Sequence, residues 1–247
     1  MKKILLVSLL LIFSFNFIPL ESISVEALNP LEGKIIALDA GHGGTESGAW
    51  NEIDGEMVYE KDVNLAVVYA LKQKLEDPSV GATVVLTRVC DETISSRKSR
   101  VDMAIEECKN LYGKKCDALV SIHHNGSTDS THDGTMVIYN EKQDIPLAKA
   151  LLEALVPLTG NNEGLDHGGY GMTVYGHLVS ALTEAYYITN TQEAERYLAG
   201  VKTPVCTNED GSDYQVFTGD RINEEADALF QGLVNYFSIP PKKPPRK

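Results

Sequence analysis

Two histidines and two glutamates in this chain occur where the side chains of a folded enzyme often meet a ligand. His42 lies between glycines just after an apolar run that ends at Leu38, and glycine allows the backbone angles that would present a histidine at a strand tip. His123 closes a second apolar run, Glu184 interrupts a third, and Glu60 lies in a polar segment between the histidines. Two histidines and a carboxylate are a common ligand set for catalytic zinc. For the first segment alone, a tight turn that happens to contain a histidine is an equally good interpretation.

Five short segments containing these residues occur in a characteristic order. They are Asp39–Gly44 (Asp-Ala-Gly-His-Gly-Gly), Glu60–Leu65 (Glu-Lys-Asp-Val-Asn-Leu), Leu86–Arg88, Ser121–Asn125 (Ser-Ile-His-His-Asn) and Glu184–Asn190. The ordered set resembles the zinc-dependent N-acetylmuramoyl-L-alanine amidases, from about residue 34 to residue 237. Each segment alone is a weak signal, but the set in this order is specific.

The resemblance implies both an activity and a role for each residue. Enzymes of this family cut the amide bond between the lactyl group of muramic acid and the peptide stem of bacterial peptidoglycan. His42, Glu60 and His123 are implied as zinc ligands, and Glu184 as the catalytic carboxylate. Zinc would polarise the amide carbonyl and lower the pKa of its bound water to about 7. Glu184 lies in an apolar strand context that raises a carboxyl pKa, which suits a group that accepts the proton and passes it to the leaving amine.

Other functions are consistent with parts of the chain. A zinc peptidase that cuts within the peptide stem, or a catalytically inactive relative that only binds the cell wall, could carry similar segments. Ser95–Lys98 matches the Ser-x-x-Lys pattern of some serine hydrolases, but the companion patterns Ser-Asp-Asn and Lys-Thr-Gly are missing. Glu60 could also be a helix-terminal acid favoured by the helix dipole. The expectation remains a zinc amidase with Zn²⁺ as cofactor and peptidoglycan as substrate.

Residues 1–27 have the features of a secretory signal peptide. Two lysines precede an apolar run from Ile4 to Leu20, and Val-Glu-Ala at 25–27 offers small residues at a cleavage site. An uncleaved membrane anchor is the alternative, although a proline and an asparagine within the run weaken a spanning helix. No later stretch approaches the ~20 apolar residues that a span requires, so no stable span is expected after cleavage. We therefore expect export to the periplasm, the cell wall or the medium.

Composition limits the domain count and the partners. The 247 residues suffice for one well-buried domain after the leader, here expected at 28–239, and the Pro- and Lys-rich tail at 240–247 is expected to be disordered. A net charge of −13 argues against nucleic acid as a partner. The domain is expected to act as a monomer.

Apolar runs alternate with segments of helical periodicity along the chain. Strands are expected at 34–39, 82–88, 118–123, 135–139 and 179–188, and helices at 62–75, 96–108, 146–155 and 223–237. Asn190, with Glu193 three residues later, predicts the capped start of one more helix. This alternation predicts an α/β domain with a mostly parallel, twisted sheet flanked by helices. Ligands bind beyond the carboxyl ends of such strands, so His42 and His123 are expected at one edge of the sheet.

Several further residues are weaker candidates for the site. Adjacent strand residues point to opposite faces, so only one of His123 and His124 can reach a metal from a regular strand. The family pattern selects His123, which leaves His124 as a structural or substrate-side residue. The remaining candidates are Glu52 and Glu56, the loop residue His132, His167 and His177 in a Gly-rich stretch (166–176) expected to line the groove, and Arg88 and Arg100, which match family arginines but could equally be structural.

The chain departs from the family pattern at several points. Tyr186 stands where a glycine is usual and is expected to narrow or line the groove. Extra stretches lie between residues 104 and 117 and at about 201–218. Because Cys108 and Cys116 bracket the first stretch in an exported chain, we predict a disulfide between them. Cys90 and Cys206 are then left as a second pair, one of three pairings that four cysteines allow.

Overall fold

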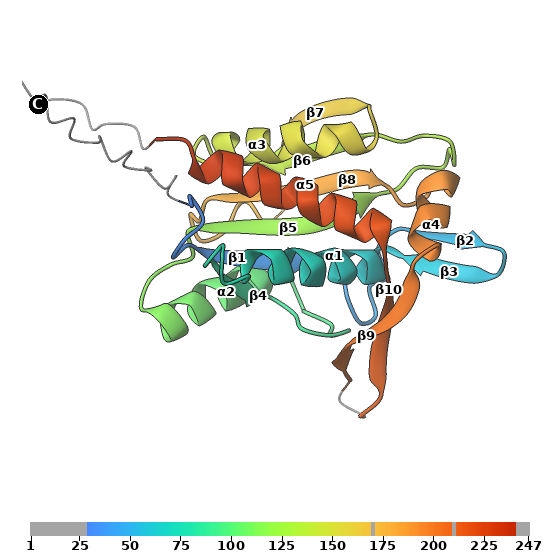
Figure 1. Ribbon diagram of the computed structural model, residues 1–247, viewed down its shortest axis with the longest axis horizontal. Helices are drawn as coiled ribbons and strands as arrows, with labels where there is room; N and C mark the ends of the chain where they lie inside the picture. The colour runs from blue at the N-terminus through green and yellow to red at the C-terminus, as the bar shows by residue number, and fades with distance from the viewer. Residues whose placement is uncertain (1–28, 169–170, 209–210, 241–247) are drawn as a thin grey trace, which may run out of the picture.

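A six-stranded sheet in the order β4-β1-β5-β8-β6-β7 forms the centre of the computed structural model (Figure 1). Strands β4, β1, β5 and β8 are parallel, β6 runs antiparallel to β8, and β7 is parallel to β6. The strands are β1 (Ile35–Ala40), β4 (Thr83–Leu86), β5 (Ala118–Asn125), β6 (Thr135–Tyr139), β7 (Asn162–His167) and β8 (Ser180–Tyr187). The expected α/β domain with a mostly parallel sheet is confirmed.

The structure describes residues 29–168, 171–208 and 211–240. The leader expected at 1–27 lies outside the described residues, as does the tail beyond residue 240. Within the described ranges, no helix has both the length and the apolar character needed to cross a membrane.

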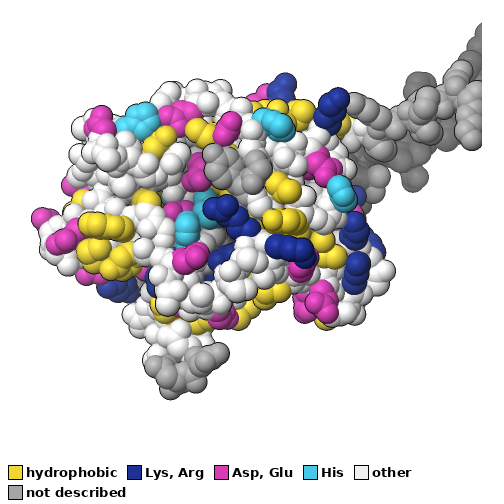
Figure 2. Space-filling model, turned by 180° about the vertical axis from the view of Figure 1, so that it is seen from behind, with side chains coloured by type: hydrophobic (Ala, Val, Ile, Leu, Met, Phe, Trp, Pro, Cys, Tyr) yellow, Lys and Arg dark blue, Asp and Glu magenta, His cyan; other side chains and the backbone are white. Residues whose placement is uncertain are grey.

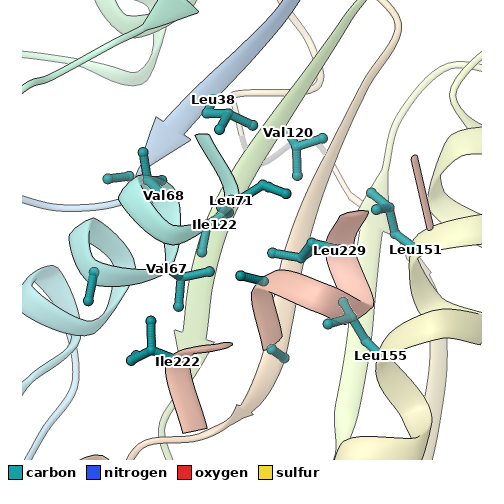
Figure 3. Packing of buried hydrophobic residues seen from close by; sticks show 14 of the residues in the cluster. Leu38, Val67, Val68, Leu71, Val120, Ile122, Leu151, Leu155, Ile222 and Leu229 are labelled. Atoms are coloured by element: carbon teal, nitrogen blue, oxygen red, sulfur yellow. The ribbon is translucent and has the colours of Figure 1, made fainter. Parts of the chain in front are cut away.

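Helices cover both faces of the sheet and create two apolar cores. On one face lie α1 (Glu60–Leu75), α3 (Ile145–Leu155) with a short 3₁₀ turn η1 (Val156–Leu158), and α5 (Asp220–Phe237). Figure 3 shows leucines, isoleucines and valines of these helices meeting Leu38, Val120 and Ile122 of the sheet. The other face packs on α2 (Arg97–Tyr112), where alternate residues of the same strands, such as Ala37 and Leu119, are buried. Burial on both faces explains why β1 and β5 read as continuous apolar runs.

The start of helix α4 (Thr191–Leu198) was predicted only in part. The Asn190 side chain accepts hydrogen bonds from the backbone N–H groups of Gln192 and Glu193, as a capping asparagine should. The Glu193 carboxylate, however, binds Arg196 and the buried Arg221 instead of returning to the cap. The prediction that Glu193 is the capping partner of Asn190 is therefore wrong, because the Glu193 carboxylate is paired with the buried guanidinium of Arg221.

Two hairpins and strand β7 have no counterpart among the predicted elements. The hairpins are β2 (Trp50–Ile53) with β3 (Glu56–Tyr59), and β9 (Val201–Thr207) with β10 (Asp213–Thr218). Their residues are mostly exposed or half-buried, so they lack the apolar runs that identified the central strands. The β9–β10 hairpin is the expected insertion at 201–218, and it projects from the body of the domain (Figure 1).

Both expected disulfides are present. Cys108 and Cys116 join the end of α2 to the segment before β5, and Cys90 and Cys206 join the loop after β4 to strand β9. The second bridge connects residues 116 positions apart, so it fastens the projecting hairpin to the central domain.

Candidate metal centre and cleft

His42, Glu60 and His123 come together at the carboxyl edge of the sheet. The Glu60 carboxylate lies between the two imidazoles: its Oε2 is 3.1 Å from Nε2 of His42, and its Oε1 is 2.9 Å from Nδ1 of His123. One nitrogen or oxygen from each of the three residues lies within 4.8 Å of the others. The ligand atoms of a tetrahedral zinc site with bonds of about 2.0–2.2 Å lie about 3.3 Å apart. The residues present therefore fit a zinc ion in both donor chemistry and spacing.

Backbone geometry brings the two histidines to this point. His42 follows β1 and itself adopts the left-handed region, with a φ of 58°. A Cβ at Gly41 would lie 2.3 Å from the His123 ring, and one at Gly48 would lie 2.3 Å from the Glu60 carboxylate. The glycines around His42 therefore provide close approach to the other two side chains, while the turn itself strains the histidine backbone.

Glu60 is the first residue of α1 and is buried. Its carboxylate accepts hydrogen bonds from the backbone N–H groups of Ala49 and His124, at 2.8 and 3.1 Å. Burial by itself would raise the pKa of Glu60, but hydrogen bonds to His123 and His42 and the charges of these histidines lower that pKa well below its usual range. The group is therefore held as a carboxylate, the form that a metal requires.

The two candidate arginines stabilise the loop that carries His42. Arg88 donates to the backbone carbonyls of Ala40, Gly41, Lys61 and Cys90, and Arg100 donates to those of Ala40 and His42. Arg100 also pairs with the fully buried Asp39 at 3.0 Å. Burial would raise the pKa of Asp39, but Arg100 and two hydroxyl groups lower it. These contacts favour the structural interpretation of both arginines.

The loop that carries His42 is also held by Asp91 and the Cys90–Cys206 disulfide, and these contacts were not predicted from the sequence. Asp91, directly after Cys90, accepts hydrogen bonds from the backbone N–H of Gly44 at 2.7 Å and from Nζ of Lys61 at 2.7 Å. The Cys90–Cys206 disulfide ties this segment to the β9–β10 hairpin. The hairpin also reaches α1, because the Tyr214 hydroxyl donates to the Asp62 carboxylate. The only sequence signal was that Cys90 and Cys206 remained as a pair.

Replacing Cys90 and Cys206 together with serine should weaken zinc binding by about tenfold, since residues that orient metal ligands from behind typically contribute 10–100-fold. The bridge holds Asp91 against the His42 loop, and its loss leaves that loop with fewer restraints. Competition with a chromogenic chelator measures the affinity. The Cys108→Ser/Cys116→Ser variant is the matched control, because that bridge lies away from the loop. Equal affinities in the two double variants would contradict the prediction.

Glu184 lies beside the cluster on the neighbouring strand. In the parallel pairing of β5 and β8 it is opposite His123, and cross-strand partners project from the same face of a sheet. Its Oε2 is buried and accepts no hydrogen bond from the described residues. Burial, together with the nearby Glu60 carboxylate, raises the pKa of Glu184 well above its usual range. The expected desolvation is present, and no contact with Arg88 offsets it.

A cleft of about 800 Å³ opens over these residues. On the face opposite α1, α3 and α5, Figure 2 shows histidine side chains at the centre with Lys or Arg side chains beside them. Met136, Ile138 and Leu182 supply apolar surface along the sheet. Residues at the start of α2 and in the Gly-rich stretch add to the lining, among them Ser96, Arg97, Lys98, Asp166, Met172 and Tyr175. The expectation that this stretch lines the groove is confirmed for Asp166, Gly171, Met172 and Tyr175.

The other histidine and glutamate candidates have partners away from the cluster. His124 points to the opposite side of the sheet, where its ring nitrogens lie 2.7 Å from Asn64 and 2.9 Å from Glu225. His132 contacts Glu163, His167 contacts the Asn140 carbonyl, His177 contacts Glu141, Glu52 is exposed, and Glu56 pairs with Lys202. Only His42, Glu60 and His123 form a three-residue cluster of this kind among the described residues.

The expected role of Tyr186 is wrong. Its ring is fully buried on the face of the sheet away from the cleft, 4.3 Å from the ring of His124, with the Arg221 guanidinium 3.9 Å from its centre. In a regular strand Tyr186, two residues after Glu184, would point to the same face as Glu184. The register between β5 and β8 shifts just beyond His123, however, and this irregularity turns the Tyr186 side chain to the other face.

The chain is similar to known proteins over most of its length. Residues 36–200 match the family model described as "Amidase_3: N-acetylmuramoyl-L-alanine amidase". The protein YqiI of Bacillus subtilis is 29% identical over 216 residues, which are 86% of this chain and 89% of YqiI. The N-acetylmuramoyl-L-alanine amidase LytC of Bacillus subtilis is 30% identical over 173 residues, 68% of this chain but only 32% of LytC.

The fold is also similar to that of a solved amidase structure. The catalytic domain of CwlV, an N-acetylmuramoyl-L-alanine amidase from Bacillus (Paenibacillus) polymyxa, superposes with a TM-score of 0.62 at 27% identity. The alignment covers 82% of this chain and 97% of the CwlV domain. The present chain thus corresponds to a whole catalytic domain of that protein and to about a third of LytC.

Proposed function

Because this chain belongs to the family of N-acetylmuramoyl-L-alanine amidases, we propose that it uses zinc to hydrolyse the amide bond between N-acetylmuramic acid and L-alanine in bacterial peptidoglycan. The match to the family model and the similar amidases confirm the family and the enzyme class that the sequence predicted. The observation that carries the proposal is the position of Glu184, beside the His42–Glu60–His123 cluster and in the same cleft.

His42, Glu60 and His123 would hold the zinc ion. When bound, zinc acts as a Lewis acid that polarises a carbonyl and makes a water molecule acidic near neutral pH. The Glu60 carboxylate supplies negative charge and, through its bonds to Ala49 and His124, is fixed in one orientation. Arg100 fixes the His42 backbone in turn, so the chain holds its ligands before any substrate arrives.

Glu184 is the proton carrier of the proposed mechanism. As a carboxylate it accepts the proton of the attacking water, and as a carboxylic acid it donates that proton to the nitrogen of L-alanine as the C–N bond breaks. Burial beside Glu60 raises the Glu184 pKa, which brings the two forms closer in energy near neutral pH. The products are a free lactyl carboxyl group on the glycan and a peptide with a free amino terminus.

The substrate also bears on location. Peptidoglycan lies outside the cytoplasmic membrane, so the export expected from residues 1–27 would bring the enzyme to it. We propose an exported, monomeric enzyme that acts on the wall.

The purified protein should contain about one zinc ion per chain, and exhaustive chelation should abolish hydrolysis of peptidoglycan. The described residues contain one such three-residue cluster, and the ion it would hold supplies the Lewis acid that the hydrolysis requires. Elemental analysis gives the zinc content, and turbidity of a cell-wall suspension gives the activity before chelation, after it and after zinc is restored. Full activity in the chelated protein would contradict the zinc dependence without affecting the family assignment.

A further inference from the structure

Arg97 is a cation in the cleft without a partner among the described residues. It is the first residue of α2, it is exposed, and it lines the same cleft as His42, His123 and Glu184. No hydrogen bond or ion pair with another described side chain occupies its guanidinium. The neighbouring Lys98, in contrast, is bound to Asp102, at 2.5 Å.

The place of Arg97 is unfavourable for the isolated helix. The amino end of a helix carries partial positive charge and favours acidic residues, yet the first turn of α2 contains none. This occurs in a chain with a net charge of −13, where acidic residues are plentiful. A cation in this position therefore lowers the stability of the helix slightly, which is consistent with a role outside the fold.

The surrounding chain leaves room for this side chain. Gly171, on the opposite wall, has a φ of +78°, and a Cβ there would lie 2.5 Å from Cδ of Arg97. The stem of Arg97 therefore lies against a wall that only glycine can form without displacing it.

Arg97 also lies at a defined place relative to the metal cluster. Residues three positions apart share one face of a helix, and Arg100 is one such step, about 4.5 Å of rise, further along α2. The Arg100 guanidinium binds the backbone carbonyl of His42. A peptide extends by at most about 3.3–3.6 Å per residue, and Arg97 lines the same cleft as His42, His123 and Glu184, so it is placed to meet a stem that runs along this cleft from an amide at the cluster.

We propose that Arg97 binds a free carboxylate of the peptide stem, one or two residues beyond the amide that is cut. This inference rests on the proposed function and adds a preference for acidic over amidated stems. The chemistry favours a carboxylate because a guanidinium presents paired N–H donors that match its two oxygens. The stem is its source, because the muramic acid carboxyl is itself part of the amide that is cut. Glu46 and Asp166 also line the cleft, so a specific cationic partner is needed for an acidic group to bind there.

Two synthetic muramoyl peptides test the proposal. They differ only in the second stem residue, whose carboxyl group is free in one and a primary amide in the other. The wild type should have a kcat/KM about tenfold higher on the acid, because a charged hydrogen bond that is partly exposed to water is made only with that substrate. Arg97→Gln should remove the preference by lowering kcat/KM on the acid alone, chiefly through KM, whereas Arg97→Lys should retain part of it.

Lys98→Gln is the matched control, since it removes the same charge from the adjacent residue and leaves Arg97 in place. It should keep the preference for the acid, and all variants should keep the zinc content of the wild type. Equal kcat/KM on the two peptides in the wild type would overturn the proposal, as would an equal loss on both in Arg97→Gln or a loss of preference in Lys98→Gln. If the wild type cleaves neither peptide but the cluster binds zinc, the proposed function itself fails, and the carboxylate site fails with it.

Discussion

Replacing Glu184 with glutamine is expected to lower the turnover of peptidoglycan by about a hundredfold or more, while the zinc content stays unchanged. Glutamine keeps the size and shape of the side chain but cannot accept the proton of water or return it to the leaving amine. The variant therefore removes one chemical step and leaves the cleft otherwise intact.

The surroundings of Glu184 explain why its loss should matter so much. The carboxyl group lies on a buried strand next to His123, with no cation paired to it among the described residues. Burial and the Glu60 carboxylate raise the pKa of Glu184, so it exchanges protons more readily near neutral pH than an exposed glutamate. A glutamate whose role was structural would be expected to pair with an arginine, and Arg88 is engaged with backbone carbonyls instead.

Glu163→Gln is the control for this variant, since Glu163 is a half-buried glutamate that contacts His132 and Tyr187 outside the cleft. Turnover on peptidoglycan and zinc content are measured together for both. Loss of zinc from the Glu184 variant would make Glu184 a metal ligand. Near-normal turnover with zinc retained would remove Glu184 from the mechanism.

Replacing Glu60 with glutamine should weaken zinc binding by at least about a hundredfold and abolish activity at ordinary zinc concentrations. The carboxylate is the only negative charge in the three-residue cluster, and it contacts both histidines. A neutral amide cannot supply that charge, and its NH₂ group would face a metal or the N–H groups of Ala49 and His124, which now donate to the carboxylate.

Glu56→Gln provides the control for the Glu60 variant. Glu56 lies four residues earlier, is exposed, and pairs with Lys202 on the β9–β10 hairpin. Calorimetric titration with zinc gives the affinity of each variant, and the thermal midpoint in excess chelator shows whether the fold is retained. Wild-type zinc affinity in a folded Glu60→Gln protein would contradict the role of Glu60 as a ligand.

The strands at the centre of the sheet, β1, β5 and β8, could be predicted from the sequence because they are buried on both faces, whereas the half-buried edge strand β7 could not. Val120 and Ile122 belong to a continuous apolar run, and His123 at its end marks the carboxyl edge of the sheet. The juxtaposition of the cluster then followed from the parallel order of β1 and β5. Glu60 was harder, because an acid at a helix start has an ordinary structural explanation, and only the family resemblance selected it.

The contacts made by insertions could not be predicted in the same way. The β9–β10 hairpin has mostly exposed residues, so its strands have no apolar pattern, and its link to the His42 loop depends on a bridge between residues 116 positions apart. The same limit explains Tyr186, whose side depends on a register shift between β5 and β8 that no local pattern reveals. The position of Arg97 in the cleft could not be predicted either, because it depends on the packing of α2 against Gly171, which is distant in the sequence.

The most direct test of the central claim is mass-spectrometric analysis of the products of peptidoglycan digestion by the zinc-loaded protein. The proposed function predicts glycan fragments whose muramic acid ends in a free lactyl carboxyl group, together with intact stems that begin with a free L-alanine amino group. Both products should be absent from a digest with Glu184→Gln. Fragments cut within the peptide stem, with the lactyl amide intact, would contradict the proposal and indicate a peptidase, and the absence of any cut would indicate a protein that only binds the wall.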